Sequence, residues 1–214
     1  MLSIVATPIG NLEDISLRAL RVLKEADVII AEDTRHTGLL LKHYKISHKP
    51  MVSLYDEVER QKVSELVSLV AGDQKVVLVS DAGTPLISDP GYKLVREAIA
   101  NGVKVEAVPG PNAAITALIL SGLPPDKFLF LGYPPEKESH QQQILDGLPK
   151  NVTVIFYVAP HKLLRFLKLV DGNQEIVVAR ELTKVYEEIW RGKASDTMIK
   201  FAKPQGEFVV LWHN

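Results

Sequence analysis

The segment Glu32-Asp33-Thr34-Arg35-His36 places four ionisable side chains within five positions. Two carboxylates beside an arginine and a histidine can transfer a proton or hold a phosphate group. A similar charged turn, Arg180-Glu181-Leu182-Thr183-Lys184, occurs in the second half of the chain. Further positive charge follows the first cluster at Lys42, His43, Lys45, His48 and Lys49. The pattern predicts acid–base or phosphate-binding chemistry and local binding of an RNA backbone. For each lysine and histidine taken alone, an ordinary solvated surface position is the alternative.

Residues that favour turns are most concentrated between Ser80 and Gly91, where two Asp, two Ser, two Gly and two Pro follow an apolar run. Glycine lets a ligand approach the main chain closely, and proline makes that main chain rigid. A carboxylate at the end of a strand accepts hydrogen bonds from a ribose hydroxyl or an amine. The segment therefore predicts a polar, nucleoside-like ligand bound largely by main-chain groups. Capping of the next helix is the alternative role for Asp89.

Two other turns have ligand-binding character. One, Ala6–Leu12, contains Pro8 and Gly10, and the other opens a helix at Asn112 and Ala113 after Pro109-Gly110-Pro111. Free amides at the start of a helix attract a carboxylate. The alternative is that Pro8 and Gly10 only shape a turn and that Asn112 is an ordinary helix cap. The chain contains neither G-x-G-x-x-G nor G-x-x-x-x-G-K-[ST], which argues against the usual NAD and ATP sites.

The hydrophobic pattern places these turns at the ends of strands in an α/β fold. In the first half, strands are predicted at Leu2–Ala6, Asp27–Ala31, Met51–Leu54, Lys75–Val79 and Val103–Val108, and helices at Ser16–Ala26, Thr37–Tyr44, Glu57–Ala71 and Tyr92–Asn101. Pro-Gly-Pro continues neither element, so we predict an N-terminal domain of residues 1–111 and a C-terminal domain of residues 112–214. In the second half, helices are predicted at Asn112–Ser121, His161–Val170 and Asp196–Ala202, strands at Lys127–Leu131, Val152–Val158, Glu175–Ala179, Val185–Trp190 and Phe208–Trp212, and a polar segment at Pro134–Lys150.

Composition excludes several classes of protein. The 214 residues carry 25 Lys and Arg against 26 Asp and Glu. Overall positive charge therefore cannot hold a nucleic acid, and any nucleic-acid binding must use a local patch of basic residues. The absence of cysteine excludes disulfides, thiolate metal sites and cysteine nucleophiles, and it suits a reducing cytoplasm. The N-terminus has no basic n-region, and no apolar run approaches the roughly 18 residues of a membrane span. We expect a cytoplasmic protein.

The motifs VATPIGNLEDIS, AEDTRHT, VSDAGTPLISDPG, VPGPNAAITAL, SGLP and ARELTK occur in this order. In this the chain resembles the tetrapyrrole-methylase-like superfamily and, within it, the ribosomal RNA small subunit methyltransferase I family, which methylates a cytidine ribose 2′-hydroxyl of 16S rRNA. The resemblance implies two α/β/α domains with a cofactor cleft between them, a homodimer, and S-adenosylmethionine (SAM) as cofactor. Methyl transfer from a sulfonium is a displacement that requires no metal, so we expect none. The SAM contacts that the resemblance implies are Pro8, Ser80, Asp81, Gly83, Thr84, Pro85, Asn112, Ala113, Tyr157, Val158, Glu181 and Leu182.

The chain departs from the family pattern in two places, at Tyr55-Asp56-Glu57-Val58-Glu59 and at Val158-Ala159 before Pro160. These departures make the resemblance a weaker guide to the target nucleotide than to the cofactor. Family members also often continue past the strand that ends here at Trp212, so we expect a short relative or a truncated chain.

Methyl transfer to a ribose hydroxyl requires removal of a proton, which makes a carboxylate near the cofactor the expected base. We predict Asp33 with Arg35 in this role. If Arg35 instead pairs with Asp33 and holds a phosphate, the base is Glu181 or Asp14. Two other functions fit the same resemblance: methylation of a tetrapyrrole or corrinoid, and SAM binding without turnover in a ribosome-assembly factor.

Overall fold

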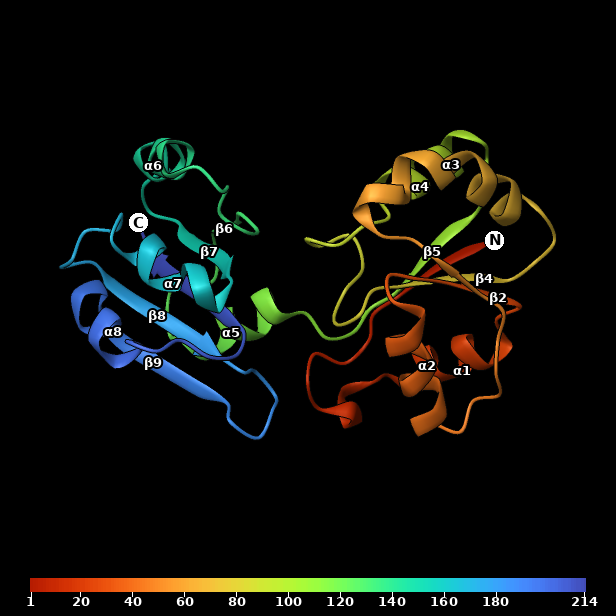
Figure 1. Cartoon of the computed structure of the whole chain (residues 1–214), viewed down its shortest axis with the longest axis horizontal. Helices are drawn as coiled ribbons and strands as arrows, with labels where there is room; N and C mark the ends of the chain where they lie inside the picture. Colours follow the sequence, from red (N-terminus) through yellow and green to blue (C-terminus); the bar gives the residue numbers. More distant parts are fainter. The chain divides into compact units, whose positions relative to one another are not determined.

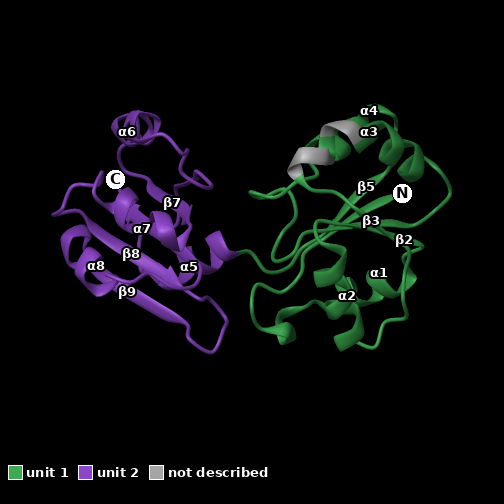
Figure 2. Ribbon diagram, viewed as in Figure 1, with its two compact units in different colours: residues 1–112 green, residues 113–214 purple. Residues whose placement is uncertain are grey.

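A computed structural model of the chain describes residues 1–214, apart from the side chains at positions 56–58, 60 and 61, which lie in the region drawn grey in Figure 2. The chain divides into two compact units, Met1–Asn112 and Ala113–Asn214 (Figure 2). Each unit contains its own five-stranded sheet.

The first unit alternates strands and helices along the chain. Its sheet has the order β3-β2-β4-β1-β5, and every pair of neighbouring strands is parallel. This confirms the predicted α/β class and its parallel sheet. The elements are β1 (Leu2–Val5), the short 3-10 helix η1 (Leu12–Asp14), α1 (Leu17–Glu25), β2 (Val28–Ala31), α2 (Thr34–His43), β3 (Met51–Ser53), α3 (Asp56–Ala71), β4 (Val76–Val79), α4 (Tyr92–Ala100) and β5 (Val105–Val108).

The central strand β4 shows why this unit has three layers. Side chains alternate between the two faces of a strand. Val77 and Val79 pack in the core with α1 and α2, whereas Val76 and Leu78 pack with α3 and α4. Figure 1 shows these two helix pairs on opposite faces of the sheet. All four β4 side chains are buried, as expected for a parallel strand that is covered on both sides.

The second unit has a mixed sheet with the order β6-β7-β10-β8-β9. Only β6 and β7 are parallel, and the other pairs are antiparallel. Its core contains Phe156 stacked on Trp212, with Phe166 tilted against both rings. The elements are α5 (Ala113–Ser121), β6 (Phe128–Phe130), α6 (Glu138–Asp146), β7 (Thr153–Val158), α7 (Pro160–Leu167), β8 (Glu175–Arg180), β9 (Glu188–Lys193), α8 (Ala194–Lys200) and β10 (Phe208–His213).

Several predicted elements differ from the structure in their bounds or type, and three of them show why. The helix predicted at residues 37–44 begins at Thr34, because the Asp33 side chain accepts from the Arg35 N–H and caps it. The polar segment predicted at residues 134–150 contains α6, whose glutamines are good helix formers. The strand predicted at residues 185–190 is β9, which starts at Glu188 because that residue pairs with Arg180.

Candidate functional site

Three of the predicted ligand-binding turns meet at the carboxyl edge of the first sheet. Thr7, after β1, and Gly83, after β4, exchange two main-chain hydrogen bonds of 2.8 and 3.0 Å. The Thr84 hydroxyl donates to the carbonyl of Pro111, after β5, at 2.9 Å. The predicted residues Pro8, Ser80 and Pro85 are buried within these turns. Parallel strands bring their carboxyl ends to one edge, and hydrogen bonds tie the three turns together there.

Two glycines allow the close packing of these turns. Gly83 has a φ of +78°, and a Cβ at this position would lie 3.2 Å from the Ile9 side chain. A Cβ on Gly110 would lie 3.0 Å from the Cβ of Ala6. A side chain at either position would require the neighbouring turn to shift, whereas glycine allows this close packing.

Residues 80–91, which we call the 80–91 loop, are also held at their far end by a residue that sequence reasoning missed. Glu59, in the first turns of α3, is buried, and its Oε1 accepts from the main-chain N–H groups of Gly91 at 3.1 Å and Lys93 at 3.0 Å. Its Oε2 forms an ion pair of 3.1 Å with the Lys93 ammonium. Burial acts to raise the pKa of Glu59, but these partners outweigh it and hold the pKa below its ordinary value.

The only sequence signal for this role was an acidic residue within the apolar pattern of a helix, which by itself suggests nothing about a distant loop. Glu59 belongs to residues 55–59, where the chain departs from the family pattern. Three side chains of that segment, at positions 56–58, lie outside the described residues.

The predicted charged cluster also lies at the carboxyl edge, after β2. The Asp33 N–H donates to Asp81 Oδ1 at 3.0 Å, and the Asp81 N–H donates to Glu32 Oε2 at 3.3 Å. These two bonds connect the end of β2 to the start of the 80–91 loop. Arg35 lies in the first turn of α2, one residue beyond Thr34.

Asp33 and Arg35 form an ion pair with three contacts, Nε to Oδ1 at 3.0 Å, Nε to Oδ2 at 3.2 Å and Nη2 to Oδ2 at 2.5 Å. The hydrogen bonds from Arg35 hold the pKa of Asp33 well below its ordinary value. A carboxylate held in this ion pair is a weaker base than an unpaired one. The Arg35 side chain is 90% exposed, so this pairing leaves the guanidinium accessible to solvent.

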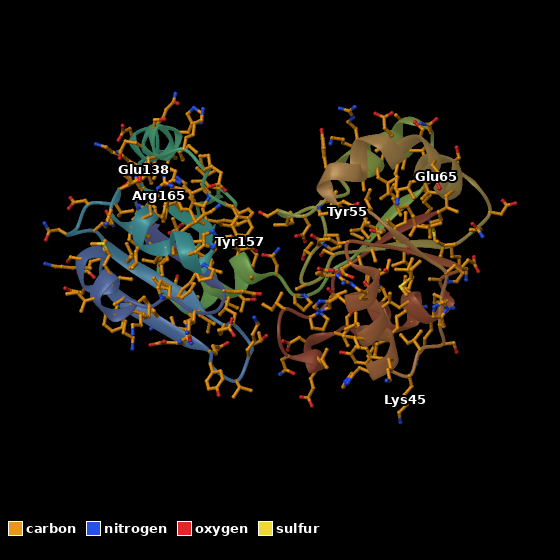
Figure 3. All side chains as sticks on the ribbon, in the orientation of Figure 1. Lys45, Tyr55, Glu65, Glu138, Tyr157 and Arg165 are labelled. Atoms are coloured by element: carbon orange, nitrogen blue, oxygen red, sulfur yellow. The ribbon has the colours of Figure 1, made fainter. Side chains whose placement is uncertain are left out.

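The second unit brings its own predicted segments together. Phe208, at the start of β10, pairs with Val158 of β7 on one side and with Arg180 of β8 on the other. The Tyr157 hydroxyl accepts from the N–H of Ala114 at 3.1 Å, in the first turn of α5. Figure 3 labels Tyr157 on its strand. The predicted residues Asn112 and Ala113 directly precede that amide in the chain.

Glu181 shapes the turn that follows β8. Its φ is +51°, and its Oε1 accepts from the Glu207 N–H at 2.9 Å and from the Lys184 ammonium at 3.1 Å. Burial acts to raise the pKa of Glu181, but these partners and the charge of Arg180 hold it below its ordinary value. A Cβ on Gly206 would lie 2.7 Å from this carboxyl group. The neighbouring predicted residue, Leu182, is buried.

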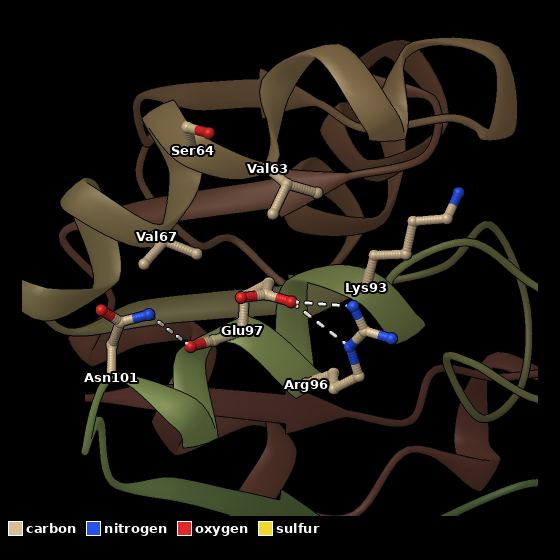
Figure 4. A pocket seen from close by; sticks show the side chains of 7 residues that line it. All are labelled: Val63, Ser64, Val67, Lys93, Arg96, Glu97 and Asn101. Atoms are coloured by element: carbon tan, nitrogen blue, oxygen red, sulfur yellow. Dashed lines mark hydrogen bonds and ion pairs between the residues drawn. The ribbon is translucent and has the colours of Figure 1, made fainter.

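A surface groove of about 440 Å³ lies elsewhere in the first unit, between α3 and α4 (Figure 4). Within it the Glu97 carboxylate accepts from Arg96, and the Glu97 carbonyl accepts from the Asn101 side chain. None of the predicted site residues lines this groove. In the described part of the chain, no group of three His, Asp or Glu is arranged to hold a metal, and no helix is long and apolar enough to span a membrane.

Comparisons with known proteins identify the family. Residues 1–197 match the family described as Tetrapyrrole (Corrin/Porphyrin) Methylases. The chain is 42% identical to ribosomal RNA small subunit methyltransferase I of Thermotoga maritima, over 98% of this chain and 96% of the relative. It is 48% identical to the protein of the same name from Escherichia coli O157:H7, over 98% of this chain and 76% of the relative.

A solved structure, uroporphyrin-III-C-methyltransferase from Thermus thermophilus, has the same fold. It matches with a TM-score of 0.68 and 20% identity, over 99% of this chain and 93% of that one. These matches extend along nearly the whole chain and agree with the α/β architecture described above. The chain belongs to the tetrapyrrole (corrin/porphyrin) methylases and, among them, to the ribosomal RNA small subunit methyltransferase I family.

Proposed function

We propose that this protein is a SAM-dependent methyltransferase that methylates the 2′-hydroxyl of a cytidine ribose in 16S rRNA. Relatives of 42% and 48% identity that are named for methylation of small-subunit ribosomal RNA support the reaction and the class of substrate. The structural observation that carries the proposal is the joining of the turns after β1, β4 and β5 at one edge of the sheet. That edge is where α/β folds bind nucleotide-like ligands.

The residues at this edge fit SAM. Gly110 is exposed and has no side chain to cover its main chain, and Asp81 supplies a carboxylate at the end of a strand, which suits a ribose hydroxyl or an amino group. When bound, SAM supplies a methyl group on a sulfonium sulfur. The residues that we propose to hold it are Pro8, Ser80, Asp81, Gly83, Thr84 and Pro85 in the first unit, with Asn112, Ala113, Tyr157, Val158, Glu181 and Leu182 as the remaining contacts.

We assign different roles to the predicted catalytic residues. Arg35 is exposed and oriented by Asp33, which suits it to hold a phosphate of the substrate. The Asp33 carboxylate is engaged by Arg35, and Glu181 Oε1 accepts from Lys184 and from the Glu207 N–H, which disfavours both as the proton acceptor. Asp14, exposed at the end of η1 after the Pro8 turn, is then the carboxylate that remains from the predicted set. It would accept the proton of the ribose hydroxyl.

Methyl transfer tests this function directly. Small ribosomal subunits from a strain that lacks the modification are incubated with the protein and methyl-labelled SAM, and a tetrapyrrole is offered in parallel. Label on a cytidine ribose of 16S rRNA is expected. Label on the tetrapyrrole alone, or SAM binding with no transfer to either, would favour one of the two rival functions.

Variants of the charged residues test their roles at equal SAM occupancy. Asp14→Asn is expected to lower the rate of transfer by about 100-fold, because general base catalysis contributes at least this much. Arg35→Ala is expected to raise the KM for RNA more than it lowers kcat. Unchanged turnover in Asp14→Asn would remove this residue from the catalytic set.

We further propose that the two units act as domains of residues 1–111 and 112–214, and that the protein works as a homodimer in the cytoplasm. Size-exclusion chromatography with light scattering measures the mass of the protein in solution. A mass of one chain would contradict the dimer.

A further inference from the structure

One face of α2 carries a continuous stripe of exposed side chains that the cofactor site does not use. Arg35, His36, Leu39, Lys42 and His43 are all exposed, whereas Thr37 and Leu41 are buried against the core. The exposed positions follow the helical spacing i, i+1, i+4, i+7 and i+8, so they lie on one side of the helix. We call these five residues the α2 surface.

The α2 surface is positively charged and contains no carboxylate. The whole of α2 lacks Asp and Glu, and because its cap, Asp33, is paired with Arg35, the unpaired positive charge of this surface is that of Lys42. Lys45 extends the positive charge beyond the end of the helix, and Figure 3 shows it at the periphery of its unit. Leu39, which is 68% exposed, adds apolar area between the charged ends.

Helix α7 in the second unit provides a contrast. It also has basic residues and no acidic one, but Lys162 is paired with Glu136 and Arg165 with Glu138. Figure 3 shows Glu138 and Arg165 close together. Among the described residues, Lys42 and Lys45 have no such ion pair. Unneutralised lysines on a helix face free of acids are suited to a polyanion rather than to an ordinary salt-bridged surface.

The α2 surface also leads to the candidate site. Its first residue, Arg35, is paired with Asp33, whose N–H is bonded to Asp81 in the 80–91 loop. From Arg35 to Lys42 is seven residues, a rise of about 10 Å along the helix axis. A chain of phosphates that lies along this stripe therefore ends beside the proposed cofactor loop.

We propose that the α2 surface binds the sugar–phosphate backbone of the RNA substrate and positions it at the carboxyl edge of the first sheet. This inference rests on the proposed function and adds the surface that holds the RNA. Lys42 and Lys45 make phosphate contacts, and Arg35 makes the contact nearest to the reacting nucleotide. His36 and His43 contribute ring N–H donors, and Leu39 contacts a ribose or a base.

The salt dependence of RNA binding tests this surface. A fluorescent fragment of 16S rRNA is titrated with protein between 50 and 200 mM salt, and log K is plotted against log salt concentration. Each phosphate contact contributes about 0.7–0.9 to the slope. Lys42→Gln is expected to reduce the slope by about one such contact, and Lys42→Gln with Lys45→Gln by about two. SAM affinity is expected to stay unchanged in both variants.

Lys104→Gln is the matched control, because it removes the same charge from an exposed position in the same unit. Lys104 directly precedes β5, at the opposite edge of the sheet from β3, against which α2 packs. It is expected to leave the slope unchanged.

The outcomes separate this inference from the proposed function. If the wild-type protein methylates 16S rRNA but the lysine variants keep the wild-type slope, the α2 surface is not the phosphate contact and the inference fails alone. Weaker binding with an unchanged slope would also overturn it, because that result indicates a contact other than phosphate. If the wild-type protein neither binds nor methylates the RNA, the proposed function fails.

Discussion

Glu59 is expected to hold the 80–91 loop in place, and Glu59→Gln tests this. The substitution keeps the shape of the side chain and one carbonyl oxygen for the N–H groups of Gly91 and Lys93. It removes the negative charge, so both hydrogen bonds become neutral and the ion pair with Lys93 is lost. The loop should then open more often while the rest of the fold remains intact.

The size of the effect follows from these contacts. Hydrogen bonds to a charged group contribute about 1.5–3 kcal/mol each and neutral ones about 1 kcal/mol, so two weakened bonds cost at least about 1 kcal/mol. The ion pair adds up to about 1 kcal/mol, since the Lys93 side chain is 35% exposed. A total of at least about 1–2 kcal/mol corresponds to at least roughly 5- to 30-fold more frequent opening at 1.4 kcal/mol per factor of ten.

Amide hydrogen exchange at Gly91 and Lys93 is the suitable assay, because it reports local opening at the two bonds concerned. Tryptophan fluorescence is not suitable, since Trp190 and Trp212 both lie in the second unit. Glu65→Gln is the matched control, because Glu65 is an exposed glutamate on the same helix (Figure 3). Equal exchange in the two variants would refute the anchoring role of Glu59.

Three further changes test other contacts. Thr84→Val removes the hydrogen bond to Pro111 and is expected to raise the Kd for SAM about fivefold, which corresponds to about 1 kcal/mol, by calorimetry. Tyr157→Phe removes the acceptor for the Ala114 N–H and is expected to cost about 1 kcal/mol in urea unfolding followed by tryptophan fluorescence; an unchanged midpoint would contradict this. Glu181→Gln is expected to lower the Tm of the second unit at pH 7. Because the pKa of Glu181 is lowered in the folded state, the stabilisation by its carboxylate is present above the ordinary pKa of 4.5 and is lost as the pH falls below it. The difference in Tm between wild type and variant should therefore shrink in acid. A difference in Tm that does not depend on pH would show that the charge of Glu181 is not its cause.

Sequence reasoning succeeded where a local pattern determines the structure. The apolar run that became β4 and the glycines and prolines after it predicted a buried strand and a ligand-binding loop, and the strand is confirmed. Sequence reasoning failed where a residue far away in the chain determines the bounds of an element. The start of β9 is set by pairing with β8, whereas Val185 and Tyr186, which favoured a strand by residue type, are exposed in the connection.

The candidate site shows the same division. The turns could be predicted because glycine, proline and acidic residues cluster in sequence. Their mutual contacts could not, since the Thr7–Gly83 bridge and the Glu59 anchor join residues that are far apart along the chain. The ion pair of Asp33 with Arg35 was among the predicted alternatives, but only the geometry shows that both carboxylate oxygens are engaged.

Calorimetric titration with SAM tests most directly whether the joined turns of the first unit bind the cofactor. The wild-type protein is expected to bind one SAM per chain. A side chain at a φ of +78° costs about 1–2 kcal/mol and meets Ile9, so the turn in Gly83→Ala is expected to shift away from the arrangement that we propose for binding. If binding must restore that arrangement, the affinity falls by about 5- to 30-fold. Gly38→Ala, where the added Cβ makes only ordinary contact, is expected to bind like the wild type. Absence of heat with the wild-type protein, or equal affinity in the two alanine variants, would contradict the account.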